Sequence, residues 1–256
     1  MRSAMLAILT AALLPLPAFA AATPLSLYLA GQFSQAETAG IAENDATGYA
    51  IAARAVLADD MMRDQPCLDC LKKAEDLARK AIAADPRVPE GHIYLAAAIG
   101  YEARIIGNLA AQSKGYASEA KRELDAALAS DPTNPWALAA MGSWHIEIVR
   151  GGGATLARWL FGARLESGQD YYAKAITAAP GNLVIRYQYA LALAAYDLPE
   201  YQKDVETSLT QALACQPQSV YETFTRNRAR ELLDTLKRGD TSVALRLVRH
   251  DQGYPS

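Results

Sequence analysis

The sequence contains few of the residues that carry out chemistry. Three cysteines and three histidines are spread over 256 residues. No Gly-x-Ser-x-Gly, Gly-x-x-x-x-Gly-Lys-Ser/Thr or His-Glu-x-x-His pattern occurs, which argues against an α/β-type serine hydrolase, a P-loop nucleotide hydrolase and a zinc peptidase. We therefore expect a protein that is not an enzyme and that uses no metal and no cofactor.

The chain also lacks a basic excess and, beyond its first residues, a long apolar run. Its 25 Lys and Arg against 28 Asp and Glu give a net charge of −3, so nothing attracts the phosphates of a nucleic acid. No later segment is apolar over the roughly 20 residues that a membrane helix needs. We expect no nucleic-acid partner and no membrane span in the mature protein.

The first twenty residues have the layout of a secretory signal peptide. Arg2 precedes the apolar run from Met5 to Leu16, and Ala18-Phe19-Ala20 is a small-x-small cleavage site. Pro15 and Pro17 end the run before it is long enough to cross a bilayer. The pattern predicts cleavage after Ala20 or Ala22 and a mature protein in the bacterial periplasm.

Four similar phrases, each ending in a proline, organise the rest of the chain. They cover residues 81–86, 127–132, 175–180 and 212–217. Small alanines allow two helices to approach closely, and proline cannot continue the hydrogen-bond ladder of a helix. Asn134, Asn182 and Ser219 follow two residues after a proline and are good N-caps for the next helix. The phrases predict recurring helix pairs.

This pattern resembles the tetratricopeptide repeat (TPR), an antiparallel helix pair of about 34 residues. Small residues stand at the small positions of the second helices: Ala74 and Ala81, Ala120 and Ala127, Gly168 and Ala175. The resemblance implies an all-α, right-handed solenoid of about four TPR-like helix pairs with insertions and a C-terminal capping helix. The insertions are expected to lengthen a first helix at residues 101–114 and to add a short helix at residues 154–165.

The domain organisation follows from these assignments. We expect a signal peptide at residues 1–20, an N-terminal linker at 21–45, the TPR-like helical repeat domain at 46–237 and a frayed C-terminal tail at 238–256.

The third repeat, with Met141-Gly142-Ser143-Trp144-His145-Ile146-Glu147 and Trp159-Leu160-Phe161-Gly162, is similar to the regulator of microtubule dynamics family and its bacterial relatives. An exported protein does not meet microtubules, so this resemblance informs the fold and not the function.

In TPR domains, ligands are bound mainly by the first helices, which line the concave face. By register, the resemblance places on this face Glu90, Ile93, Tyr101, Trp136, Ser143, Glu147, Tyr187 and Leu191. Few of these residues are charged, which favours a hydrophobic peptide or self-association. The leading hypothesis is a scaffold for protein–protein interaction with an unidentified protein or peptide partner. The alternative is a small-ligand binder of a transport system, with a closed pocket near Trp136 and Tyr187.

Cys67-Leu68-Asp69-Cys70 supports a third hypothesis, a thiol-disulfide enzyme. Redox enzymes that use this motif place it after a strand, and no strand pattern precedes it here, so a structural disulfide between Cys67 and Cys70 is favoured. Among the other candidate residues, His92 and His145 are interpreted as hydrogen-bonded packing residues. Trp144 and Trp159 are expected to hold the added helix against the third repeat.

Overall fold

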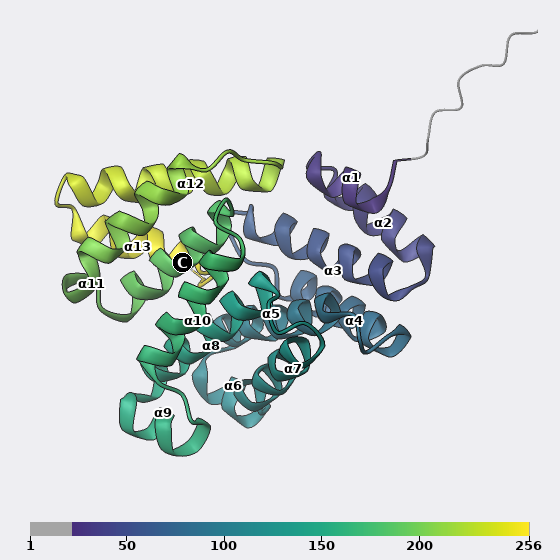
Figure 1. Cartoon of the computed structure of the whole chain (residues 1–256), viewed down its shortest axis with the longest axis horizontal. Coiled ribbons are helices and arrows are strands. Elements are labelled where there is room, and N and C mark those ends of the chain that lie inside the picture. The colour runs from purple at the N-terminus through teal and green to yellow at the C-terminus, as the bar shows by residue number, and fades with distance from the viewer. Residues whose placement is uncertain (1–21, 256) are drawn as a thin grey trace, which may run out of the picture.

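The computed structural model describes residues 22–255, which fold into helices and contain no strand (Figure 1). The predicted signal peptide at residues 1–20 lies outside the described residues. The helices are α1 (Pro24–Leu29), α2 (Phe33–Glu43), α3 (Ala46–Met61), α4 (Leu68–Ala84), α5 (Pro89–Ile106), α6 (Asn108–Ser113), α7 (Tyr116–Ser130), α8 (Pro135–Gly152), α9 (Ala154–Phe161), α10 (Leu165–Ala178), α11 (Leu183–Ala214), α12 (Val220–Lys237) and α13 (Thr241–Asp251).

Neighbouring helices pack against one another in chain order. The main contacts join α2 to α3, α3 to α4, α4 to α5, α5 to α7, α7 to α8 and α8 to α10, after which α11 packs on α8 and on α12. The short helices α6 and α9 lie outside this succession, at one edge of the molecule (Figure 1). This all-helical arrangement of packed pairs confirms the fold class predicted from the repeated phrases.

The prolines and asparagines define the helix ends as expected. Asp85 (φ −154°) and Asp131 (φ −140°) close α4 and α7 in the extended conformation that a following proline requires. The side chain of Asn134 accepts the N–H groups of Trp136 and Ala137 at 3.0 and 3.2 Å. Asn182 caps α11 in the same manner. Local sequence therefore sets where each of these helices begins and stops.

The long helix α11 is two helices joined at a kink. Asp197 has a non-helical backbone (φ −158°, ψ 88°), two residues before Pro199. Its carboxylate accepts the N–H of Glu200 at 3.2 Å, which caps the second half. The kink therefore divides α11 into two helices that can pack in different directions.

Two glycines allow α8 and α10 to approach closely. A Cβ atom on Gly142 would lie 2.7 Å from Cδ2 of Tyr172 and 2.9 Å from the carbonyl oxygen of Gly168. Such distances are shorter than van der Waals contact, so only glycine fits at this crossing. The crossing holds Tyr172, which is fully buried, in the core of the third repeat.

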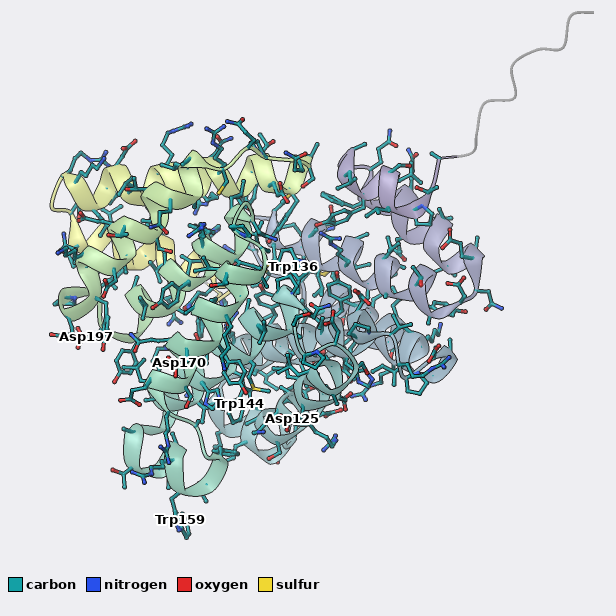
Figure 2. The ribbon with its side chains drawn as sticks, viewed as in Figure 1. Asp125, Trp136, Trp144, Trp159, Asp170 and Asp197 are labelled. Carbon is teal, nitrogen blue, oxygen red and sulfur yellow. A yellow bond between two sulfur atoms is a disulfide. The ribbon has the colours of Figure 1, made fainter. Side chains whose placement is uncertain are left out.

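The two insertions take different forms. The expectation that residues 101–114 lengthen the preceding helix holds only as far as Ile106, because Gly107 adopts φ +83° and separates α6 from α5. The second insertion does form the added helix α9. Trp144 packs against Phe161 of α9, with ring centroids 6.4 Å apart, but Trp159 is 80% exposed and points away from the molecule (Figure 2). Trp159 therefore does not hold α9 in place.

Both ends of the described chain are folded. Residues expected to form a linker make α1 and α2, which bury Tyr28, Phe33 and Ala36. Residues expected to form a frayed tail make α13, which buries Ala244 and Val248. Apolar contact with the preceding helices orders these segments. Within residues 22–255, no helix has the length and apolar character needed to cross a membrane.

The N-terminal helices also reach the C-terminal ones. A Cβ atom on Gly31, in the turn between α1 and α2, would lie 2.8 Å from Cβ of Val220 at the start of α12. Gly31 has φ +76°, so glycine is favoured there by both conformation and space. The chain thus curves until the turn between α1 and α2 touches the start of α12, which encloses the space between them.

Candidate functional site

A central cleft of about 490 Å³ lies within this curve. Its walls come mainly from α5, α8, the first half of α11 and α12, and its apolar end reaches α6, α7 and α9. Clefts of about 300 to 1,000 Å³ commonly hold small ligands or anchoring side chains. The volume and the mixed lining make this cleft the candidate functional site.

Five of the eight residues predicted for the concave face line the central cleft: Tyr101, Ser143, Glu147, Tyr187 and Leu191. They come from the three first helices α5, α8 and α11, as the repeat register predicted. Tyr187 and Leu191 are each only 5% exposed, because the C-terminal residues cover them. The repeat register therefore identified residues that line the cleft, but it did not indicate that the C-terminal residues cover two of them.

The remaining three predicted residues lie outside the cleft. Ile93 is 5% exposed and packs in a small core with Ala127 and Ala137. Trp136 packs against the first turn of α11, and its ring lies 5.8 Å from the guanidinium of Arg54 on α3. Glu90 does not line the cleft. The N-terminal helices fill this end of the curve, so a pocket shared by Trp136 and Tyr187 does not form.

A charged cluster stands at the centre of the cleft. The carboxylate of Glu147, on α8, forms ion pairs with the guanidinium groups of Arg150 at 2.7 Å and of Arg104, on α5, at 3.7 Å. The side chains of Arg104, Glu147 and Arg150 are 18%, 20% and 29% exposed. Two guanidinium groups thus share one carboxylate in a partly desolvated place, where charges interact more strongly than in bulk water. The cluster has a positive excess that suits an acceptor-rich group.

The C-terminal segment, residues 252–255, binds to this cluster. Arg104 Nη1 donates to the carbonyl oxygen of Gln252 at 2.8 Å, and the amide of Gln252 donates to Glu147 at 3.2 Å. Arg150 donates a hydrogen bond to the hydroxyl of Tyr254. The ring of Tyr254 also lies 5.5 Å from the Arg150 guanidinium. In Figure 1 the C-terminal end accordingly lies in the middle of the molecule.

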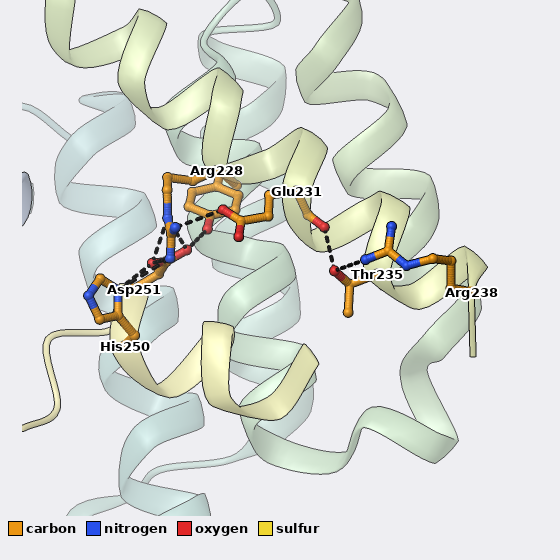
Figure 3. Close-up of polar contacts among 7 residues, drawn as sticks. Arg228, Glu231, Thr235, Arg238, His250 and Asp251 are labelled. Atoms are coloured by element: carbon orange, nitrogen blue, oxygen red, sulfur yellow. Dashed lines mark hydrogen bonds and ion pairs between the residues drawn. The ribbon is translucent and has the colours of Figure 1, made fainter. Parts of the chain in front are cut away.

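A second ion pair fixes α13 beside the cleft (Figure 3). The carboxylate of Asp251, 6% exposed, accepts Nε of Arg228 at 2.9 Å and a hydrogen bond from the hydroxyl of Tyr187. Burial, reinforced by the negative charge of Asp251, raises the pKa of Tyr187 well above its usual value. Tyr187 therefore stays a hydroxyl donor, and the last turn of α13 is held over the first half of α11.

The other end of the cleft is apolar and opens at the surface. Trp144, Ile148, Leu156, Leu160 and Phe161 line it. Leu156 and Leu160 are about half exposed, at 49% and 47%. Nearby on the inserted helices, Leu109 and Trp159 are 83% and 80% exposed. The inserted helices thus form a rim of exposed apolar side chains, which we call the α6–α9 rim (Leu109, Leu156, Trp159 and Leu160).

The two histidines interpreted as packing residues are buried and hydrogen-bonded. His92 bonds Glu123 at 2.7 Å and the carbonyl of Pro86 at 2.9 Å, one with each ring nitrogen. His145 accepts the backbone N–H of Arg164 at 3.2 Å, and burial lowers its pKa. Their packing roles are confirmed.

Cys67 and Cys70 form the predicted disulfide at the start of α4, and Cys215 is a free thiol. Within residues 22–255, one group brings three potential metal-binding side chains together, namely Asp60, Cys67 and Cys70. Because the two sulfurs are bonded to each other, this group is not a metal site in the oxidised protein.

Sequence reasoning missed the four residues that join the charged cluster to the C-terminal segment: Arg104, Arg150, Gln252 and Tyr254. Two of them carried a usable signal, since Arg104 follows Tyr101 by three residues and Arg150 follows Glu147 by three, which places each on the same helix face. Gln252 and Tyr254 carried none. Their contacts join residues more than a hundred positions apart in the sequence.

Comparison with known proteins assigns the chain to a family. No individually curated protein matches the chain. The family model of regulator of microtubule dynamics protein 1-3 matches residues 47–237, from the start of α3 to the end of α12. The match covers the charged cluster and the α6–α9 rim, whereas the C-terminal segment lies beyond it. The chain belongs to the regulator of microtubule dynamics protein 1-3 family.

Proposed function

We propose that this protein is a TPR scaffold of the bacterial periplasm whose central cleft binds a segment of a partner protein and is itself non-catalytic. One observation carries the proposal: the cleft already holds a peptide segment, the chain's own residues 252–255, through backbone and side-chain contacts. Five positions of the TPR ligand-binding register line the same cleft.

The contacts explain how such a cleft would select its partner. Arg104 recognises a backbone carbonyl, which every peptide offers, whereas Glu147 and Arg150 recognise polar side chains. The apolar end under Trp144 and Phe161 offers room for a hydrophobic side chain. Binding that combines an apolar anchor with a few oriented polar groups is typical of peptide recognition.

The α6–α9 rim extends this surface outside the cleft. Tryptophan is among the residue types that dominate protein–protein binding energies, and the neighbouring exposed leucines add apolar surface around it. Trp159 projects from α9 into solvent (Figure 2). A partner that inserts one segment into the cleft would bury this rim with its neighbouring surface.

The periplasmic location rests on the sequence of residues 1–20, and the microtubule role in the family's name is not proposed for an exported protein. Fractionation of cells that express the full chain, followed by mass spectrometry of the mature N-terminus, tests the location. A periplasmic product that begins at residue 21 or 23 is expected. A cytoplasmic product that retains Met1 would contradict it.

The binding role is tested by photocrosslinking in cells. A photoreactive residue at Gln188, which lines the cleft and is half-buried, is compared with one at Lys203 on the exposed side of α11. Each probe is placed in the full chain and in a chain that ends at Asp251. We expect one protein captured from Gln188 only, and more of it when residues 252–256 are removed.

Equal capture from both probes, or no capture from Gln188 in either folded chain, would contradict the scaffold.

The small-ligand binder is the second candidate, favoured by the volume and partial enclosure of the cleft. Mass spectrometry of the purified, undenatured protein would then show an added small-molecule mass. That mass should disappear in a Ser143→Trp variant, whose larger side chain fills the cleft.

A further inference from the structure

The disulfide between Cys67 and Cys70 sits at the N-terminus of a helix. Cys67 is the N-cap of α4, and its sulfur accepts the backbone N–H of Cys70 at 3.2 Å. Backbone N–H groups and the helix dipole at this position stabilise negative charge on sulfur. Both cysteines are only half-buried. Cys67 can therefore leave the disulfide as a stabilised thiolate.

A buried carboxylate lies beside this disulfide. Asp60, in the last turn of α3, is 1% exposed. Its Oδ1 accepts the N–H of Cys67 at 2.8 Å, whereas Oδ2 has no hydrogen-bond partner among the described residues. A carboxylate oxygen of Asp60 and the two sulfurs all lie within 4.8 Å of one another. A half-satisfied carboxylate in this position is poorly explained by helix capping alone.

The surroundings of Asp60 make it a weaker acid than an exposed aspartate. Burial raises the pKa of Asp60, against the lowering effects of the Cys67 N–H and of Arg63. A void of about 10 Å³, close to the size of one water molecule, separates Asp60 from the C-terminal segment. The charged and titratable groups that face Asp60 are Asp59, Arg63, Asp64, Tyr101, His250 and Tyr254.

We propose that Cys67 and Cys70 form a redox-active pair that exchanges its disulfide with a dithiol of another protein, and that Asp60 transfers a proton to the departing sulfur. This activity is independent of the binding function of the central cleft. It requires no strand before the motif, because the helix N-terminus and the buried acid supply the two groups that the exchange needs.

The exchange balances in two steps. A thiolate of the partner attacks Sγ of Cys70, the S–S bond breaks, and Cys67 leaves as the thiolate that the α4 N-terminus stabilises. The partner's second thiolate then attacks the partner's own sulfur in the mixed disulfide, so that the partner's disulfide forms, the bond to Cys70 breaks, and Cys70 leaves and takes its proton from Asp60. Two electrons pass from the partner dithiol to the cysteine pair. The partner's thiols lose two protons to solvent: one is taken up by the Cys67 thiolate, and the other replaces the proton that Asp60 gave to Cys70.

The test measures the rate at which dithiothreitol, as the dithiol, reduces the disulfide of the full chain between pH 5 and 9. Alkylation followed by mass spectrometry reads the reduced fraction. The Asp60→Asn variant keeps an oxygen that can accept the Cys67 N–H but cannot transfer a proton. The matched control is Asp69→Asn, an acid of the same helix start whose side chain is 94% exposed.

We expect Asp60→Asn to slow reduction about tenfold near neutral pH and to flatten the pH profile, since proton transfer by a positioned group accelerates reactions by at least that much. Asp69→Asn should stay within about twofold of the unmodified chain, because salt and water screen an exposed charge. Reduced and oxidised chains should melt at similar temperatures. Equal rates and pH profiles for the two variants, or loss of α4 on reduction, would overturn the proposal and leave a structural disulfide.

Discussion

Glu102 is a buried acid whose protonation is linked to folding. It is 2% exposed on α5, its Oε2 accepts the hydroxyl of Tyr116 at 3.0 Å, and its Oε1 has no partner among the described residues. Burial and the neighbouring Glu75 raise the pKa of Glu102 to about 7. The folded chain therefore holds this proton more tightly than the unfolded chain, in which a glutamate titrates at about 4.3.

The free energy of unfolding should accordingly fall as pH rises from about 4.5 to about 7, and then level off. Glu102→Gln removes this titration and should stabilise the protein above pH 7 by on the order of 2 kcal/mol. Urea denaturation at pH 5 and pH 8 measures both effects. The exposed Glu200→Gln should keep the slope of the unmodified chain, and an unchanged slope in Glu102→Gln would refute the assignment.

Asp251 provides a second prediction at the residue scale. Its replacement by asparagine leaves Arg228, 19% exposed, without its main counter-charge. We expect a loss of about 2 kcal/mol in the free energy of unfolding, because an unpaired charge is costly where it is poorly solvated. Glu231→Gln removes the other partner of Arg228, but its side chain is 51% exposed and it should change stability by less than about 0.5 kcal/mol. Equal losses in the two variants would show that α13 is not held by Asp251.

At the scale of the elements, the crossing of α8 and α10 depends on glycine. Gly142→Ala would place a methyl group 2.7 Å from the ring of Tyr172 and should destabilise the protein by about 2 kcal/mol or more. Gly100→Ala is the matched control, since no described atom lies within 4 Å of its added Cβ. That variant should gain about 0.5 to 1 kcal/mol from helix propensity. Thermal denaturation of both variants checks the opposite signs.

The sequence predicted those helices whose ends are marked by a proline or by a capping side chain within a few residues. The residues before Pro86 and Pro132 and the caps Asn134 and Asn182 act within a few positions, so the boundaries followed from chemistry near each residue. Helices α1 and α2 were missed because packing against other helices orders them, and their own sequences contain few periodic apolar residues. Tertiary contact decided these two elements, as it commonly does for short helices. Helix α13 does carry an apolar face, with Ala244 and Val248 buried four residues apart, so its sequence held a signal that was overlooked.

The closure of the whole molecule explains what the sequence could and could not indicate about the site. Repeat register correctly brought Tyr101, Ser143 and Glu147 to one cleft, because each lies on the same face of a first helix. It could not indicate that α3 would reach Trp136 or that residues 252–255 would occupy the cleft. Those contacts depend on the curvature summed over many helix pairs.

The contact of α1 and α2 with α12 predicts that these helices are coupled. Tyr28, 3% exposed, lies under the guanidinium of Arg54 at 4.1 Å, and the adjacent Gly31 touches Val220. Tyr28→Ala should speed amide hydrogen exchange about tenfold or more in α1, in α2 and in the first turn of α12. Exchange in α10, which lies far from this contact in the packing order, should not change. Faster exchange confined to α1 and α2 would show that the ends fold independently.

The exposure of Trp159 gives the molecule a built-in optical probe. Of the three tryptophans, Trp144 is 7% exposed and Trp136 is half-buried, whereas Trp159 is 80% exposed. Its indole should emit at long wavelength and be quenched by acrylamide, while the other two emit at shorter wavelength and are shielded. A partner that covers α9 would shift the emission to the blue and abolish the quenching, so binding at the α6–α9 rim can be followed without a label.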